Sequence, residues 1–214
     1  FSMIMQNREY LFTQGNHGYF DLEYILKTTV SEDVCALDQV DWAPIFITDV
    51  FQLVRGREGN MAMLESGDVP LISAKNSNNG LKGFVNTPKK TIAGHSISLN
   101  NDGDGGAGLA YYQPANMALD THVTALIPKC DVSKWALIFI AKCISGLHGF
   151  FGHGLSISNK RATKIRIMLP IGKDGTPDYE YMEQYAKNLM LRKYKQYLAY
   201  LDSKERTAPA TEND

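Results

Sequence analysis

Two glycine-rich loops hold the side chains best suited to recognising a polar partner. Residues 75–80 have the sequence KNSNNG, and residues 100–106 have the sequence NNDGDGG. Asn-Gly is a strong turn signal because both residues tolerate a positive φ. Side-chain amides donate and accept hydrogen bonds, so these loops favour recognition of a polar group over a place in the core.

A pair of arginines on a glycine-flanked turn adds a second kind of polar group. Arg55 and Arg57 lie on either side of Gly56, and Glu58 and Gly59 follow them. Such a turn is usually solvated. A guanidinium presented there can also reach a phosphate or a guanine edge, so the pattern leaves both interpretations open.

Short apolar runs beside these loops predict the strands that position them. Residues 69–74 and 81–85 predict a hairpin around the first loop, and residues 96–99 and 109–112 predict one around the second. The same alternation predicts a strand at 123–127 and a last one at 165–171.

Two helices follow from capping residues and helical spacing. Ser133 is a suitable N-cap for a helix at 134–145, with apolar residues spaced to face a core. Thr176 is expected to cap a second helix with Pro177 at its first position, extending to about residue 203.

The final helix carries an apolar stripe without a second long helix in the sequence to cover it. Such stripes are more often core than anything else. Here we expect the stripe to pack against another subunit or against a segment outside this sequence. The residues expected at that contact are Met182, Tyr185, Leu189, Tyr194, Tyr197 and Leu201.

Length and composition predict one domain of medium size with an appendage. The 214 residues are 44% hydrophobic and 21% charged. The longest apolar run, residues 135–141, is far shorter than the roughly 20 residues of a membrane span. Cys35, Cys130 and Cys143 form no disulfide framework, and no secretory signal is visible. We therefore expect a reducing, cytoplasmic setting.

Charge is segregated along the chain although the net charge is only −1. Residues 1–70 hold 4 basic and 11 acidic residues, whereas residues 71–170 hold 11 basic and 4 acidic residues. A basic region of this kind suits a polyanionic partner. An acidic face lying beside a basic one would produce the same count, so charge alone does not decide.

The motifs that suggest cofactors or metals lack the neighbouring elements, ligands or spacing that such sites require. Residues 103–108 satisfy G-x-G-x-x-G, but a strand signal follows where a dinucleotide site requires a helix. Asp102 and Asp104 lack the further oxygen ligands of a calcium loop. Cys143, His148 and His153 lie five residues apart, unlike the close pairs of structural zinc sites. The sequence indicates no cofactor, metal or catalytic centre.

Several blocks along the chain follow a recognisable order. They are WAPIFITDVF at 42–51, VPLISA at 69–74, NNG at 78–80, ISLN at 97–100, Tyr112, and residues 161–170, which end in Leu-Pro before the long helix. Residues 41–202 thereby resemble the target-recognition domain of specificity (S) subunits of type I and related restriction-modification systems. In that family an α+β domain binds double-stranded DNA in the major groove, and a long helix packs antiparallel against its counterpart as a spacer.

The resemblance implies a domain plan and a set of partners. Residues 1–40 have no clear role, residues 41–175 form a recognition domain with a mixed, twisted β-sheet and short helices, residues 176–204 form one long spacer helix, and residues 205–214 form a disordered tail. The implied partners are DNA, an adenine methyltransferase that would itself bind S-adenosylmethionine, a restriction subunit, and a second copy of this chain. The chain alone is expected to have neither methyltransferase nor nuclease activity.

One departure from the family pattern leaves the form of the whole protein open. Family S subunits usually carry two recognition domains and two spacer helices, whereas this sequence has one of each. A half-subunit, a fragment and the recognition end of a fused enzyme all fit.

Residue type and loop position assign the individual DNA contacts. Basic residues are expected to hold phosphates; they are Lys75, Lys82, Lys89, Lys90, Lys160, Arg161 and Lys164. Amides and two arginines are expected at base edges; they are Asn76, Asn78, Asn79, Asn100, Asn101, Arg55 and Arg57. A carbohydrate- or protein-binding module using the same loops is the alternative; its binding would be insensitive to salt.

Overall fold

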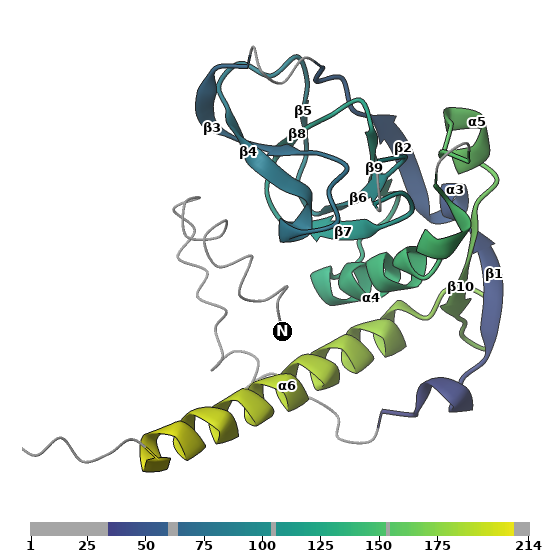
Figure 1. The fold of residues 1–214 in the computed structure, drawn as a ribbon. Coiled ribbons are helices and arrows are strands. Elements are labelled where there is room, and N and C mark those ends of the chain that lie inside the picture. The colour runs from purple at the N-terminus through teal and green to yellow at the C-terminus, as the bar shows by residue number, and fades with distance from the viewer. Residues whose placement is uncertain (1–33, 60–63, 104–105, 153–154, 208–214) are drawn as a thin grey trace, which may run out of the picture.

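The computed structural model describes residues 34–59, 64–103, 106–152 and 155–207 (Figure 1). The fold is α+β with a long C-terminal helix, as the sequence predicted. The described strands form three small sheets, whereas one mixed, twisted sheet was expected from the sequence. Helix α4 (Lys134–Ser145) lies between the sheets and the long helix α6 (Tyr179–Thr207) (Figure 1). The predicted disordered tail begins too early, because residues 205–207 still belong to α6. Residues 208–214 and residues 1–33 lie outside the described residues.

The central sheet is fully antiparallel, with strand order β2-β9-β6-β7. Its strands are β2 (Phe51–Arg55), β9 (Val123–Pro128), β6 (Ser96–Asn100) and β7 (Ala110–Gln113). The predicted hairpin around the second loop is confirmed by the pairing of β6 with β7. Every residue of β6 is buried, because the strand has a neighbour on each side and a layer of structure on each face.

The second sheet has the order β4-β3-β8-β5 and is mixed, because β3 and β8 run parallel. Its strands are β3 (Ser66–Ile72), β4 (Leu81–Val85), β5 (Thr91–Ile92) and β8 (Met117–Leu119). The predicted hairpin of the first loop is confirmed as β3 and β4. The sequence did not reveal β5 and β8, since two or three residues are too few to show a period.

A two-stranded ribbon joins the beginning and the end of the recognition domain. Strand β1 (Trp42–Phe46) pairs antiparallel with β10 (Arg166–Pro170), so that Trp42 lies opposite Pro170. Helix α6 is the next element after strand β10 of this ribbon. Short helices fill the connections; they are η1 (Leu37–Gln39), α3 (Ile47–Val50), η3 (Asn78–Gly80), η4 (His148–Phe150) and α5 (Asn159–Ala162).

Helix α4 begins and ends where the sequence predicted. The Ala136 backbone N–H donates to Ser133 Oγ at 3.2 Å, which confirms the cap. Its buried face, including Leu137 and Ile140, packs on the central sheet within the largest hydrophobic core. Trp135 and Phe139 are buried as well, and the Phe139 ring meets Trp42 of β1 and Tyr185 of α6. Among the described helices, none is long and apolar enough to cross a membrane.

Helix α6 begins two residues later than expected. Asp178 is its cap, because the Tyr181 backbone N–H donates to Asp178 Oδ1 at 2.9 Å. Thr176 is not the cap; its hydroxyl instead donates to the Asp174 carboxylate. Gly175 takes a φ of 77° in the turn between them, and only after this turn can the backbone become helical.

The expectation that the whole α6 stripe lacks a mate within the chain is wrong for its first half. Met182 is 0% exposed and belongs to the same core as α4. Tyr185 meets the ring of Phe139 edge-on, with 5.7 Å between centroids. Helix α4 is short, yet the core that it shares with α6 buries Met182 and Ala186 and half-buries Tyr185. Further along, Leu189 is 40% exposed.

The remaining stripe residues lie in the second half of α6, which projects away from the domain (Figure 1). Tyr194 and Tyr197 are half-buried, and the Leu201 side chain lies outside the described residues. The stripe therefore combines a core segment with a segment that leaves the core.

Met182→Ala tests this division of α6. Truncating a fully buried Met leaves a cavity, and we expect a loss of about 2–5 kcal/mol in the free energy of unfolding. Leu189→Ala, at an exposed position, should change it by about 0.5 kcal/mol or less. Urea denaturation of both variants measures the difference. Equal losses would show that Leu189 belongs to the core as well.

Candidate nucleic-acid interface

Loops from distant parts of the chain meet around the end of the central sheet where β2 and β6 stop. We call them the loop cluster: residues 55–59, 73–80, 86–90, 100–103, 106–109, 119–122 and 155–164. Backbone hydrogen bonds connect them. Asn101 N donates to His122 O at 2.8 Å, Ile157 N donates to Asn101 O at 2.6 Å, and Glu58 N donates to Leu119 O at 3.0 Å.

The first asparagine loop is pinned down by its own amides. Asn78, Asn79 and Gly80 have consecutive φ values of 50°, 54° and 78°, which confirms the predicted Asn-Gly turn. Asn79 is buried, and its Nδ2 donates to Tyr112 O at 2.9 Å. Gln113 Nε2 donates in return to Asn79 O at 2.9 Å. Asn79 thus holds the loop on β7, and the expectation that it contacts a base edge is corrected.

Asn100 and Asn101 are also structural, contrary to the expectation from loop position. Both are fully buried. Asn100 Nδ2 donates to Lys75 O at 2.9 Å, and Asn101 Oδ1 accepts from Thr124 Oγ1 at 2.9 Å. The physical reason is that other loops cover this end of β6, so a polar side chain there must bond within the protein.

The two glycine-rich loops, residues 75–80 and 100–106, lie in direct contact with each other. A Cβ on Gly103 would come within 2.9 Å of Ala74 O, and one on Gly106 within 3.1 Å. Lys75 is engaged as well, since its Nζ donates to Leu81 O at 3.1 Å. What the first loop presents to solvent is its tip, Asn76 to Asn78, together with Lys82 on β4.

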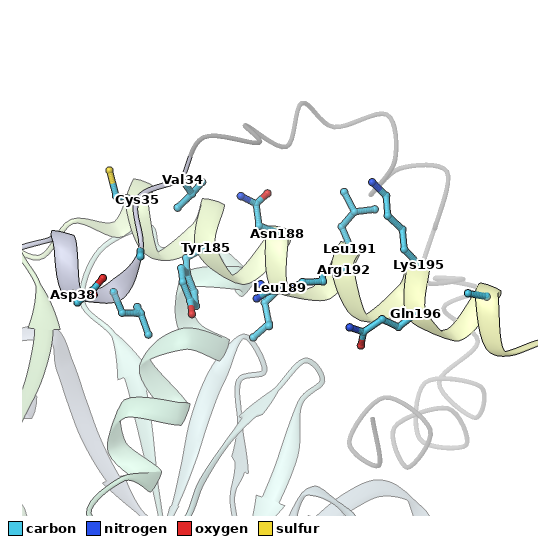
Figure 2. A pocket seen from close by; sticks show the side chains of 13 residues that line it. Val34, Cys35, Asp38, Tyr185, Asn188, Leu189, Leu191, Arg192, Lys195 and Gln196 are labelled. Atoms are coloured by element: carbon cyan, nitrogen blue, oxygen red, sulfur yellow. The ribbon is translucent and has the colours of Figure 1, made fainter.

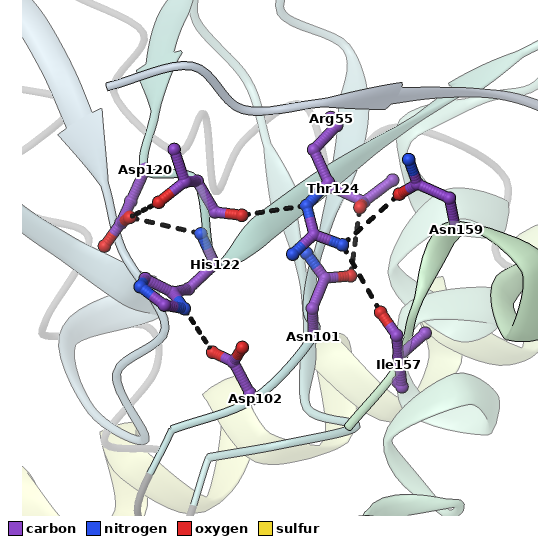
Figure 3. Close-up of polar contacts among 9 residues, drawn as sticks. Arg55, Asn101, Asp102, Asp120, His122, Thr124, Ile157 and Asn159 are labelled. Atoms are coloured by element: carbon purple, nitrogen blue, oxygen red, sulfur yellow. Dashed lines mark hydrogen bonds and ion pairs between the residues drawn. The ribbon is translucent and has the colours of Figure 1, made fainter. Parts of the chain in front are cut away.

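Arg55 clamps two segments of the loop cluster together (Figure 3). Its Nε donates to Thr121 O at 2.8 Å, and one terminal nitrogen donates to Ile157 O at 3.4 Å and to Asn159 Oδ1 at 3.3 Å. Nε and one terminal nitrogen of Arg55 thus serve the fold, and the expected base contact of this half-buried residue stays a prediction. Arg57 is exposed.

An ion pair stands on the exposed edge of the loop cluster (Figure 3). His122 Nδ1 lies 2.7 Å from Asp102 Oδ1. The hydrogen bond to Asp102 raises the pKa of His122 above its ordinary value of 6.5, and the charges of Asp102 and Asp120 add to the rise, while partial burial and the charge of Arg55 oppose it. Sequence reasoning missed this pair, because twenty positions separate the two residues and no motif links them.

A second residue that sequence reasoning missed is Glu58. Its side chain is fully buried, and its Oε1 accepts the backbone N–H groups of Lys89 at 2.7 Å and Lys90 at 3.4 Å. The carboxylate therefore fixes the connection between β4 and β5. Lys89 is left exposed on that connection and Lys90 half-buried.

Helix α5 presents the last basic group. Arg161 N donates to Ser158 Oγ at 3.2 Å, and the Arg161 guanidinium bonds to Ser156 O. Lys160 and Lys164 are exposed. The short helix thus commits Arg161 to the fold and exposes Lys160, and Lys164 is exposed in the turn that follows it.

Comparison with known proteins assigns the family. The model for the type I restriction modification DNA specificity domain matches residues 39–197. The chain belongs to this family. The specificity subunit S.BcgI of a type II restriction enzyme from Heyndrickxia coagulans is 27% identical over 186 residues, which are 86% of this chain and 50% of that protein.

Solved structures agree on the fold of this specificity domain. The S subunit of a type I system from M. genitalium has a TM-score of 0.54 at 18% identity, covering 95% of this chain and 52% of that one. The HsdS subunit from Thermoanaerobacter tengcongensis has a TM-score of 0.50 at 14% identity, covering 97% and 49%. The specificity domain spans about half the length of these relatives.

A separate hollow of about 860 Å³ lies along α6 (Figure 2). Helix α6 lies on the other side of α4 from the central sheet (Figure 1). Residues 34–38 form one wall, and Tyr185, Leu189 and Arg192 belong to the other. The exposed Leu189 side chain borders this hollow, so an apolar surface of the specificity domain is open here.

The His122–Asp102 pair predicts a pH dependence. We expect the pKa of His122 to lie above 6.5, and Asp102→Asn to bring it back toward that value. The pair stabilises the fold fully below about pH 6.5, and this stabilisation is lost as pH rises through the raised pKa. NMR titration of the imidazole measures both values. Asp131→Asn, at an exposed carboxylate elsewhere, is the control, and an unchanged pKa in Asp102→Asn would contradict the pairing.

Proposed function

We propose that this chain provides sequence-specific recognition of double-stranded DNA for a restriction-modification system. The observation that carries the proposal is the family match over residues 39–197. Its relative S.BcgI is a specificity subunit. The chain would be a specificity subunit or a part of one, without catalytic activity, and would act in the cytoplasm.

The loop cluster supports two separate roles on the DNA, phosphate contact and base contact. Phosphate contacts favour the exposed lysines, which are Lys82, Lys89, Lys160 and Lys164. Base edges favour the exposed amides and guanidinium, which are Asn76, Asn78 and Arg57. The buried amides and the clamp of Arg55 keep these groups in place.

The proposed partners follow from the family and from the fact that the chain spans about half the length of its relatives. A DNA adenine methyltransferase would supply the chemistry and bind S-adenosylmethionine, and a restriction subunit would supply cleavage. A second recognition half would come from another copy of this chain. Since α4 packs on the first turns of α6, the spacer role falls to the part of the helix from Leu189 onward.

Two substitutions distinguish a phosphate contact from recognition of a base. Lys160→Ala should weaken binding to every duplex about equally and lower the salt slope by about one, because one phosphate contact releases one counterion. Asn78→Ala should cost about 1–3 kcal/mol on the preferred duplex and little on random DNA. Fluorescence anisotropy at several salt concentrations, on duplexes selected from a random pool, measures both effects.

Lys173→Ala is the matched control, since this lysine is exposed but lies outside the loop cluster. Binding that is absent, or that does not change with salt, would contradict the proposed function. Equal losses for Asn78→Ala on preferred and random duplexes would leave DNA binding intact but move base recognition to another residue.

The pairing of two chains through α6 is tested at Leu189. A charge at this exposed apolar position should oppose association while leaving the fold intact, because the side chain is outside the core. Sedimentation velocity should give a dimer for the natural chain and a monomer for Leu189→Asp, with equal thermal melting by circular dichroism. A natural chain that stays monomeric at tens of micromolar would contradict self-pairing.

A further inference from the structure

Phe150 is the most exposed large hydrophobic side chain among the described residues. It is 71% exposed and lies at the end of η4, directly after α4. Gly149 precedes it, and a Cβ at Gly149 would meet nothing within 4 Å. The ring therefore stands clear of its surroundings.

The turn that carries Phe150 is firmly anchored. Phe150 N donates to Leu147 O at 2.9 Å, and His148 Nδ1 lies 2.6 Å from Ala107 O. Phe151 turns the other way and packs against the main core. A Cβ on Gly108 would lie 3.0 Å from both His148 Cα and the Phe151 ring. This turn therefore packs closely against residues 106–109.

The same contacts place Phe150 at the border of the loop cluster. His148 touches Ala107, at one end of the second glycine-rich loop, and Ile157 bonds to Asn101 at the other end. The segment after α4 thus lies along the second glycine-rich loop. That loop contacts the first glycine-rich loop, which exposes Asn76 and Asn78.

The charges of the segment that follows the ring point to its partner. Residues 151–164 hold Lys160, Arg161 and Lys164 and no Asp or Glu, and Lys160 and Lys164 are exposed. Such a segment attracts a polyanion. A polyanion that also rewards contact with an exposed aromatic ring is a nucleic acid, because every base offers a flat face for stacking.

We propose that Phe150 is an apolar wedge that contacts DNA bases beside the phosphate contacts of Lys160 and Lys164. The proposal rests on the proposed DNA-binding function. Its ring stacks on a base and partly opens a base step, as inserted Phe, Leu and Met side chains do in proteins that kink DNA. A methyltransferase must extrude its target base from the stack, and a wedge at the recognition domain lowers the cost of unstacking.

Phe150→Ala tests the wedge on a duplex selected by the natural chain. We expect about tenfold weaker binding, the effect typical of losing one aromatic–base stack. The salt slope should stay unchanged, because no charge is removed. The same duplex with 2-aminopurine at single purine positions should show a fluorescence increase when the natural chain binds. Phe150→Ala should abolish the increase, and Phe150→Trp should keep it.

Met168→Ala is the matched control, since Met168 is a 50% exposed hydrophobic residue on β10. Thermal melting verifies that each variant is folded. Unchanged affinity and an unchanged fluorescence increase in Phe150→Ala would overturn the wedge. A variant that binds DNA normally but loses a methyltransferase subunit would also overturn it and assign the ring to a protein interface. Absence of salt-dependent binding by the natural chain would instead reject the DNA-binding function itself.

Discussion

Buried side-chain amides are the constraint on which the loop cluster depends. Asn79, Asn100 and Gln113 each donate to a backbone carbonyl of another segment. A buried polar group left without a partner costs about 1–3 kcal/mol, so the loops cannot shift without breaking several such bonds together. The exposed tip of the first loop is therefore held in one conformation before any partner arrives. Preorganisation of this kind reduces the ordering cost of binding.

Strand β6 connects this polar layer with the hydrophobic core. Ile97 and Leu99 belong to the core shared with α4. Ser98 accepts from Gln113, and Asn100 bonds to the first loop. The period of two along a strand sends successive side chains to opposite faces. One five-residue strand thus supplies both the apolar packing that stabilises the domain and the amide bonds that shape its recognition surface.

The packing of α6 on α4 has a consequence for the whole assembly. Met182 and Tyr185 lock the first turns of α6 to the domain core. The direction in which the helix leaves is therefore fixed relative to the loop cluster, rather than set by a flexible linker. Under the proposed function, the same helix that completes the core would set the distance between two recognition domains, with α6 acting as a rigid spacer.

The sequence by itself determined the elements whose information is local. The Ser133 cap and helical spacing predicted α4, strand alternation predicted both hairpins, and the order of short blocks indicated the family. It could not separate Asn78 from Asn79, which are identical in type and adjacent, yet one is exposed and the other buried. It also did not predict the burial of Glu58, the His122–Asp102 pair or the burial of Met182 in the core shared with α4. Only the tertiary structure decided these, because burial in a loop depends on which distant segments pack against it, and no local pattern records that.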